Sequence, residues 1–441
     1  MSDALLIDAL GTTPALAEIF SDRTVIGAML AFESALAGAE ARAGLIPASA
    51  AEAIGAAAAD EDGFDIPALL RETRRSAAAS IPLVAALTDR VRRHQPDAAA
   101  YVHWGATSQD VADTALAVLL VRARAFLKED ARVLLRDLRQ LSDAHASTVM
   151  LGRTLLQPAT PITFGLKAAV WRSIVADGWS RLDQAIDQAA TVQLGGATGT
   201  RAAFAGKGAD IAAAIAEDLG LETSLPWHTE RGRIAAVVTA CAIFAGGLGK
   251  IARDVALLMQ AEVGEVSAAG GGSSTMPHKH NPSGCAVALA AATRVPGLAS
   301  GLLSGLAHEH ERALGGWQLE WPVVSAAVQA TGAALAAMIA TIGSLQVFPD
   351  RMRANLEATG GAIFAERASL LLRAEAGRDE AEAIVARALA RSRGTTTPFP
   401  DALRADDEAV RALGARLDTI DRFDEDIAAA EAIRAALLSR P

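Results

Sequence analysis

The chain has 441 residues, of which 51% are hydrophobic but only 4% aromatic, so its apolar core has to come mainly from Ala, Leu, Val and Ile. That length is sufficient for two or three domains, or for one large domain with smaller caps. The formal net charge is −10 and no run is rich in Lys or Arg, which argues against a nucleic-acid partner because neutralising phosphates needs a concentrated basic surface.

The first region, residues 1–105, contains shorter helical patterns and is expected to form an N-terminal helical domain. Its opening residues carry acids and lack the basic stretch followed by an apolar stretch that marks a signal peptide. Farther along the chain, Cys241 and Cys285 stand among apolar or small residues, which is typical of buried, reduced thiols. These features predict a cytoplasmic protein.

Long amphipathic helices are predicted for the middle of the chain. In residues 111–141, apolar residues recur at steps of three and four, and similar Ala-rich stretches cover about 163–190, 233–266, 285–306 and 321–345. No comparable stretch alternates with the period of two that marks a strand. The predicted fold class is therefore all-α, with a long central bundle over residues 106–349.

The last of these stretches raises the alternative of a membrane span. Residues 321–349 contain no charged side chain, which exceeds the run of about 18 apolar residues that flags a transmembrane helix. However, the stretch consists mostly of Ala, Gly, Ser and Thr and includes Gln329 and Gln346. We expect a helix buried inside a bundle, with no membrane partner. A charge-rich region follows, and residues 350–441 are expected to form a small C-terminal helical domain.

The stretch AAGGGSSTMPHKHNPSG, from Ala268 to Gly284, lies between two predicted long helices and is here called the signature loop. Its glycines favour a loop whose backbone can approach a ligand closely. The spacing of a phosphate-binding P-loop is absent. A metal site at His278 and His280 is disfavoured because no Cys or carboxylate ligands cluster nearby. A plain flexible linker is the remaining alternative.

Within this stretch, GSSTMPHKHNP resembles the signature GSSxMPxKxNP of the fumarase and aspartase superfamily. Two further segments resemble that superfamily's other shared regions, in the expected order. VHWGATSQDVADT (Val102 to Thr114) matches region one, and GRTLLQPATP (Gly152 to Pro161) matches region two. For Thr107 and Ser108 in region one, capping of the following helix is an alternative role that does not exclude the first.

The resemblance implies a homotetramer in which each active site takes its three regions from three different chains. It implies no cofactor and no metal. It also implies that Ser273 removes a proton from the carbon next to a substrate carboxylate. The residues implied as substrate contacts come from all three regions: His103, Thr107, Ser108, Thr154, Gln157, Ser274, Lys279 and Asn281.

Elementary chemistry supports such a site. A carbanion next to a carboxylate carries its charge on the carboxylate oxygens, so the site needs fixed donors and cations aimed at them. Lys279, Asn281 and the amides of a Gly-rich loop are groups of that kind. A serine is a poor base, so its alkoxide has to be favoured by a helix N-terminus or a lysine.

The sequence departs from the superfamily at Leu155, where most members have a general-acid histidine. Members that expel hydroxide or an amine need that acid, whereas a carboxylate, with an ordinary pKa of about 4, leaves as the anion. The segment HEHERALGGWQLEW, from His308 to Trp321, resembles the ERxxGxWxxEW pattern of the 3-carboxy-cis,cis-muconate cycloisomerases. This resemblance implies a small tricarboxylate substrate, for which Arg312 is a suitable bidentate cation.

Two other interpretations remain open at the level of sequence. One is a fumarate-forming eliminase similar to adenylosuccinate lyase, although Ala313, Leu314 and Gly315 replace the polar residues usual there. The other is a non-catalytic structural relative, as the crystallins of this superfamily are. A serine- and lysine-bearing mobile loop is against the second interpretation, since a purely structural bundle has no need of it.

Overall fold

The structure, a computed structural model, describes residues 6–272, 275–276 and 279–440. The chain divides into two compact units. Unit 1 consists of Met1–Arg132, Asp177–Lys250 and Ala286–Met338, and unit 2 of Val133–Ala176, Ile251–Cys285 and Ile339–Pro441. The prediction of an all-α fold is confirmed, because helices dominate both units. The three-part division at residues 105 and 349 stays a prediction.

Five long helices pass through the boundaries between the units. They are α6 (Ser108–Ala144), α7 (Phe164–Ala189), α9 (Gly232–Leu258), α10 (Ser283–Ser304) and α11 (Gly316–Gly343). Their positions follow the predicted stretches, except that α9 ends eight residues before Val266 in a turn. The apolar stripe of α6 is buried at Leu116, Leu120 and Leu127, while Phe126 on the same helix is 51% exposed.

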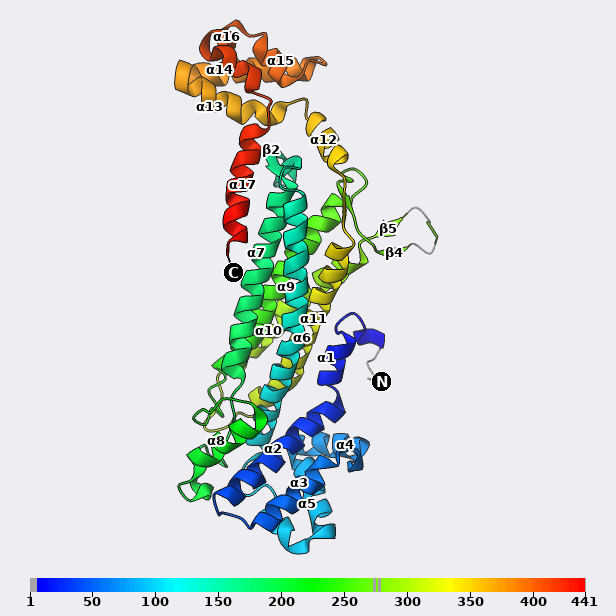
Figure 1. Cartoon of the computed structure of the whole chain (residues 1–441), viewed down its shortest axis with the longest axis vertical. Helices are drawn as coiled ribbons and strands as arrows, with labels where there is room; N and C mark the ends of the chain where they lie inside the picture. Colours follow the sequence, from blue (N-terminus) through cyan, green and yellow to red (C-terminus); the bar gives the residue numbers. More distant parts are fainter. Residues whose placement is uncertain (1–5, 273–274, 277–278, 441) are drawn as a thin grey trace. The chain divides into compact units, whose positions relative to one another are not determined.

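The remaining helices of unit 1 are each shorter than α10, and several of them, from the N-terminal part of the chain, gather in one group (Figure 1). They are η1 (Leu6–Asp8), α1 (Pro14–Ile19), α2 (Asp22–Arg42), α3 (Ala48–Ala59), η2 (Glu61–Gly63), α4 (Ile66–Ser76), α5 (Ser80–His94), η3 (Pro96–Tyr101), η4 (Ala202–Phe204) and α8 (Gly208–Leu219). Local signals define their ends. Thr13 caps α1 by accepting a hydrogen bond from the Leu16 amide, and Gly220 ends α8 in the left-handed conformation.

Unit 2 contains the C-terminal helices, of which α13 to α16 gather in one group (Figure 1). The helices are α12 (Pro349–Glu357), η5 (Ala362–Phe364), α13 (Ala365–Ala376), α14 (Arg378–Gly394), α15 (Phe399–Arg404), α16 (Asp407–Leu413), η6 (Gly414–Thr419) and α17 (Asp424–Leu438). Leu372, Ile384 and Phe399 are fully buried in one apolar cluster that holds this group together.

Among the residues that the structure describes, short strands that the sequence did not predict form three antiparallel pairs in unit 2. They are β1 (Val149–Thr154) with β2 (Gln157–Thr163), β3 (Val266–Ser267) with β6 (Gln346–Val347), and β4 (Gly271–Gly272) with β5 (His280–Asn281). Two of these pairs lie in segments that resemble superfamily regions. β1 and β2 form the region-two hairpin, residues 149–163, and β4 and β5 lie in the signature loop.

Four helices in the described part of the chain, α2, α9, α10 and α11, are long and apolar enough to cross a membrane by length and composition alone. In α11, 61% of the most apolar window is buried inside the structure, compared with 28% in α10. Small residues permit this packing. A Cβ atom on Gly332 would come within 2.1 Å of the Leu16 side chain, so α1 packs directly against the α11 backbone.

Candidate active site

Region one lies at the N-terminus of α6, in unit 1. Thr107 precedes the first helical residue, and its amide donates to the Asp110 carboxylate at 3.1 Å, while the Asp110 amide donates to the Thr107 carbonyl at 2.9 Å. This exchange closes the helix end. The Thr107 hydroxyl is left for another partner. The Ser108 carbonyl accepts a hydrogen bond from the Ser80 hydroxyl at 3.2 Å.

The side chain that contacts the Thr107 hydroxyl is Arg312. One of its terminal nitrogens donates to the Thr107 hydroxyl at 2.9 Å and to the Ala197 carbonyl at 3.2 Å. Two residues that the sequence predicted as substrate contacts are therefore in direct contact, although 205 positions separate them. A guanidinium beside a hydroxyl forms a site for an anionic oxygen.

The Asp110 carboxylate is fully buried and binds a second segment to region one. Its oxygens accept hydrogen bonds from the amides of Gly195 and Gly196, each at 2.9 Å, and one lies 2.8 Å from the His228 ring. A Cβ atom on Gly195 would come within 2.5 Å of that ring, so only glycine fits. His228 is 5% exposed, and its contact orients this carboxylate.

A buried ionic cluster joins Asp113 of α6, in region one, to Arg231, the residue before α9, and to α11. The guanidinium of Arg231 donates two hydrogen bonds to Asp113, at 2.7 and 3.0 Å, and further bonds to Glu320. The Trp317 indole donates to Asp113 at 3.2 Å. All four side chains are buried, and burial raises the pKa of the Glu320 carboxyl although Arg231 opposes it. Glu320 and Trp317 therefore stabilise the helix junction rather than face solvent.

His103 also lies in unit 1, with its Nδ1 atom 2.6 Å from the buried carboxylate of Glu33 on α2. Burial lowers the pKa of His103, but the Glu33 charge and hydrogen bond outweigh it, so the pKa is raised above its ordinary value. A second buried acid, Glu40, lies two helical turns along α2. Neither of its carboxyl oxygens has a hydrogen-bond partner among the described residues. In the sequence, Glu33 and Glu40 could have been noticed as two glutamates seven positions apart on an otherwise apolar helix face.

The region-two hairpin lies in unit 2. Thr154 and Gln157 pair at its end, and between them Leu155 and Leu156 have positive φ angles of 50° and 64°. Two residues with positive φ are what the tight turn of a two-residue hairpin requires. Leu155 is 97% exposed and Leu156 72% exposed. At the position of the usual histidine, the turn therefore presents an apolar side chain.

A buried ion pair fixes the root of this hairpin. Arg153 donates to both carboxylate oxygens of Glu265, at 2.9 and 2.6 Å, and Glu265 is fully buried. The side-chain amide of Asn355 donates to the same carboxylate at 2.8 Å. Nothing in the sequence indicated that Glu265 would be buried, because an acid just before a loop is usually solvated.

The signature loop also lies in unit 2. Lys279 is exposed, its amide donates to the Met276 carbonyl at 3.0 Å, and Asn281 pairs with Gly271 across β4 and β5. A Cβ atom on Gly270 would come within 1.9 Å of the Asn281 carbonyl oxygen, so the strands cross closely only because Gly270 has no side chain. Ser273 and Ser274, the predicted base and one predicted contact, lie outside the described residues.

The cysteine prediction is confirmed. Cys241 and Cys285 are free and buried, and burial raises the pKa of these thiols to about 12 and about 11. Such thiols are inert at neutral pH. Within residues 6–272, 275–276 and 279–440, no group of three or more His, Cys, Asp or Glu side chains is arranged to hold a metal ion.

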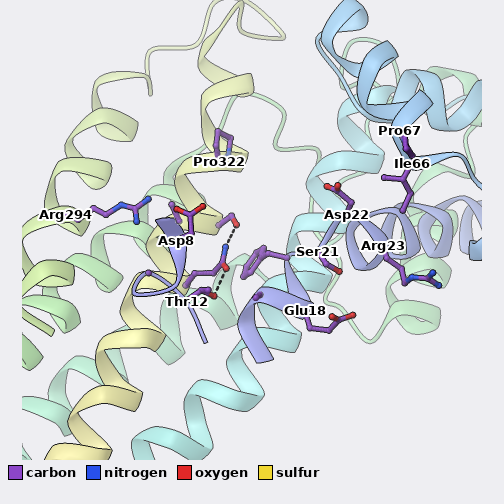
Figure 2. Close-up of a pocket in the computed structure, with 16 residues that line it drawn as sticks. Asp8, Thr12, Glu18, Ser21, Asp22, Arg23, Ile66, Pro67, Arg294 and Pro322 are labelled. Carbon is purple, nitrogen blue, oxygen red and sulfur yellow. Dashed lines mark hydrogen bonds between the residues drawn. The ribbon is translucent and has the colours of Figure 1, made fainter. Parts of the chain in front are cut away.

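A cavity of about 850 Å³ lies elsewhere in unit 1 and is bordered by α1, α2, α4, α10 and α11 (Figure 2). None of the predicted contact residues lines it. Its charged lining consists of Asp8, Glu18, Asp22, Arg23 and Arg294, so acids outnumber guanidiniums. That balance does not suit a polyanionic substrate.

Comparison with known proteins gives three results. A family model described as a lyase matches residues 9–297. The 3-carboxy-cis,cis-muconate cycloisomerase of Bradyrhizobium diazoefficiens is 41% identical over 420 residues, which cover 94% of this chain and 93% of the relative. The nitrosuccinate lyase of Streptomyces davaonensis is 39% identical and covers 94% of this chain and 90% of its own.

Among solved structures, the 3-carboxy-cis,cis-muconate lactonizing enzyme of Pseudomonas putida superposes with a TM-score of 0.89 at 38% identity, covering 98% of this chain and all of its own. Sequence and fold thus agree over nearly the whole length. The chain belongs to the fumarate lyase superfamily, which includes fumarase and aspartase.

Proposed function

We propose that this protein interconverts 3-carboxy-cis,cis-muconate and 4-carboxymuconolactone in bacterial protocatechuate breakdown. The observation that carries the proposal is the 41% identity, over 94% of the chain, to a cycloisomerase of that name. Leu155 supports it, because an acid at that position is unnecessary when the group that adds or leaves is a carboxylate.

In the proposed reaction, a substrate carboxylate oxygen bonds to one carbon of a double bond, and the adjacent carbon, next to another carboxylate, takes up a proton. Ser273 exchanges that proton. The three anionic groups are held by Thr107, Ser108 and Arg312 from region one and its neighbour, by Thr154 and Gln157 from region two, and by Ser274, Lys279 and Asn281 from the signature loop. His103 completes region one. No metal or cofactor takes part.

The proposal includes a cytoplasmic homotetramer in which three chains contribute to each site. Large apolar side chains that are exposed in the single chain support it, since soluble proteins rarely leave many of them uncovered. Phe126 on α6, Ile243 on α9 and Leu303 on α10 are each about half exposed, at 51%, 52% and 47%. A second copy of the chain would cover these faces.

The test follows the loss of ultraviolet absorbance of the conjugated diene when the enzyme is added to 3-carboxy-cis,cis-muconate. Wild type is expected to consume the diene, and Ser273→Ala to leave it unchanged. A silent wild-type enzyme refutes the cycloisomerase assignment and leaves only the superfamily.

A second candidate is a lyase acting on nitrosuccinate, favoured by the 39% identity to a protein of that name. Nitrite leaves as a stable anion, so Leu155 fits this reaction as well. Parallel incubation with nitrosuccinate, with colorimetric detection of nitrite, separates the two candidates. Release of fumarate from adenylosuccinate would instead indicate a fumarate-forming eliminase similar to adenylosuccinate lyase. The absence of a general-acid histidine at Leu155 is a disadvantage for that reaction.

A further inference from the structure

The Glu265 carboxylate joins three segments of unit 2. It accepts the two hydrogen bonds of Arg153 from β1 and that of Asn355 from α12. Its own backbone is held as well, since its amide donates to the Leu258 carbonyl at 3.0 Å and its carbonyl accepts from the Phe348 amide at 3.0 Å. Because the side chain is fully buried, each of its hydrogen bonds is electrostatically stronger than the same bond would be in water.

Glu265 stands next to both predicted substrate-binding segments of unit 2. Arg153 is the last residue before Thr154 at the end of the region-two hairpin. Glu265 directly precedes β3, from which the chain enters the signature loop. The Glu265 carboxylate therefore links Arg153, near the end of β1, to the residues that lead into the signature loop.

Apolar packing alone does not fix the hairpin at this point. Leu151 belongs to the buried cluster of the C-terminal helices, but residues 154–158 are exposed. A cavity of about 380 Å³, lined in part by Leu151, Pro158 and Asn355, adjoins the strands. The strand register also slips between Leu151 and Arg153. Beyond Leu151, the direction of the hairpin depends on the planar guanidinium of Arg153, which holds its N–H donors in a rigid geometry.

We propose that Glu265 is a positioning residue that sets the region-two hairpin and the root of the signature loop together, through Arg153 and Asn355. It touches no substrate. Its effect on catalysis rests on the proposed function, because Thr154 and Gln157 on one side, and Lys279 and Asn281 on the other, are placed by the segments that it anchors.

The test compares Glu265→Gln with wild type by hydrogen exchange and mass spectrometry. Glutamine keeps the shape but loses the charge and one acceptor facing the guanidinium. Since a hydrogen bond to a charged group contributes about 1.5–3 kcal/mol, local opening should become roughly 10- to 100-fold more frequent. Faster exchange is expected in both peptides 149–163 and 263–272, with α13 to α16 unchanged. Glu262→Gln, an exposed acid three residues earlier, is the matched control and should exchange as wild type does.

Faster exchange in only one of the two peptides, or in neither, overturns the proposal. A uniform increase that includes α13 to α16 also overturns it, because Glu265 would then only stabilise the unit. Arg153→Lys keeps the charge without the planar guanidinium and should give an intermediate change in both peptides. If the wild-type enzyme fails to consume the diene, the proposed function fails, while the exchange data still decide the positioning role. If it is active, Glu265→Gln should lower kcat/KM about tenfold or more.

Discussion

Arg312 contacts region one at its start, where its guanidinium donates to the Thr107 hydroxyl at 2.9 Å, and we expect an anionic group of the substrate to bind beside this pair. Its Nε atom is buried without a hydrogen-bond partner among the described residues, so the guanidinium has donor capacity left. A planar fork can hold a carboxylate with two parallel bonds, which a lysine ammonium cannot.

Arg312→Lys is therefore expected to lower kcat/KM for 3-carboxy-cis,cis-muconate by about 10- to 100-fold, the equivalent of one charge-assisted hydrogen bond. Steady-state diene consumption measures it. Arg71→Lys, an exposed arginine on α4, should leave the rate unchanged. Equal rates for Arg312→Lys and wild type would exclude a bidentate contact with the substrate.

Glu40 predicts how stability depends on pH. Burial foremost, and the Glu33 charge second, raise the pKa of its carboxyl from 4.5 to about 8. Between these values the folded protein keeps a proton that the unfolded chain releases, so stability falls as pH rises. The raised pKa of His103 acts in the same direction, because its stabilising charge is lost as pH rises through the folded value.

The urea midpoint of the wild-type protein should thus decline between about pH 5 and pH 8. Glu40→Gln, which stays neutral, should flatten that decline, and the exposed Glu52→Gln should not. A wild-type midpoint that is constant or rises over this interval would contradict the assignment of a neutral, buried Glu40.

At the scale of elements, the turn of the region-two hairpin is strained. Leu155 and Leu156 hold positive φ angles, and a non-glycine residue in that conformation costs roughly 1–2 kcal/mol. Asn-Gly is the preferred sequence for a two-residue turn of this kind. The two leucines therefore give this turn a conformational cost that Asn-Gly would avoid.

The double variant Leu155→Asn with Leu156→Gly is expected to raise the unfolding free energy by about 1 kcal/mol through relief of that strain. Because the turn loses its apolar surface, the variant should also lose most diene consumption. Differential scanning calorimetry and the diene assay measure the two effects. A variant that is more stable and fully active would mean that the leucines have no role in the site.

At the scale of the whole molecule, the predicted sharing of sites between chains has a direct consequence. Arg312 and Thr107 meet within one chain, whereas Ser273 is predicted to reach that site from another. Two inactive variants, Ser273→Ala and an Arg312→Ala, would therefore each carry the group that the other lacks.

Mixing the two inactive variants through unfolding and refolding should restore about a quarter of the wild-type activity, since random association completes one site in four. Each variant refolded alone is the control and should remain inactive. No recovery in mixtures that light scattering shows to be tetramers would place both residues in sites built from a single chain.

The sequence by itself determined the fold class and the family. Periodic apolar residues in Ala-rich stretches specify long helices locally, and the three superfamily segments are contiguous in the chain. The burial of the two free cysteines and of the uncharged stretch of α11 could also be predicted from the sequence, because apolar and small residues are the ones most often buried. The hairpin was missed, since β1 and β2 lack strand alternation and are held by a Gly152 bulge and a tight turn.

Only the tertiary structure decided which charged residues are buried together. Asp113 with Arg231 and Glu320, Asp110 with His228, and Arg153 with Glu265 are each separated by more than 80 positions, and no local pattern distinguishes these acids from solvated ones. A buried charge is tolerated only when folding brings its partner within hydrogen-bond distance. Its role is therefore a property of the folded chain and cannot be read from its neighbours in the sequence.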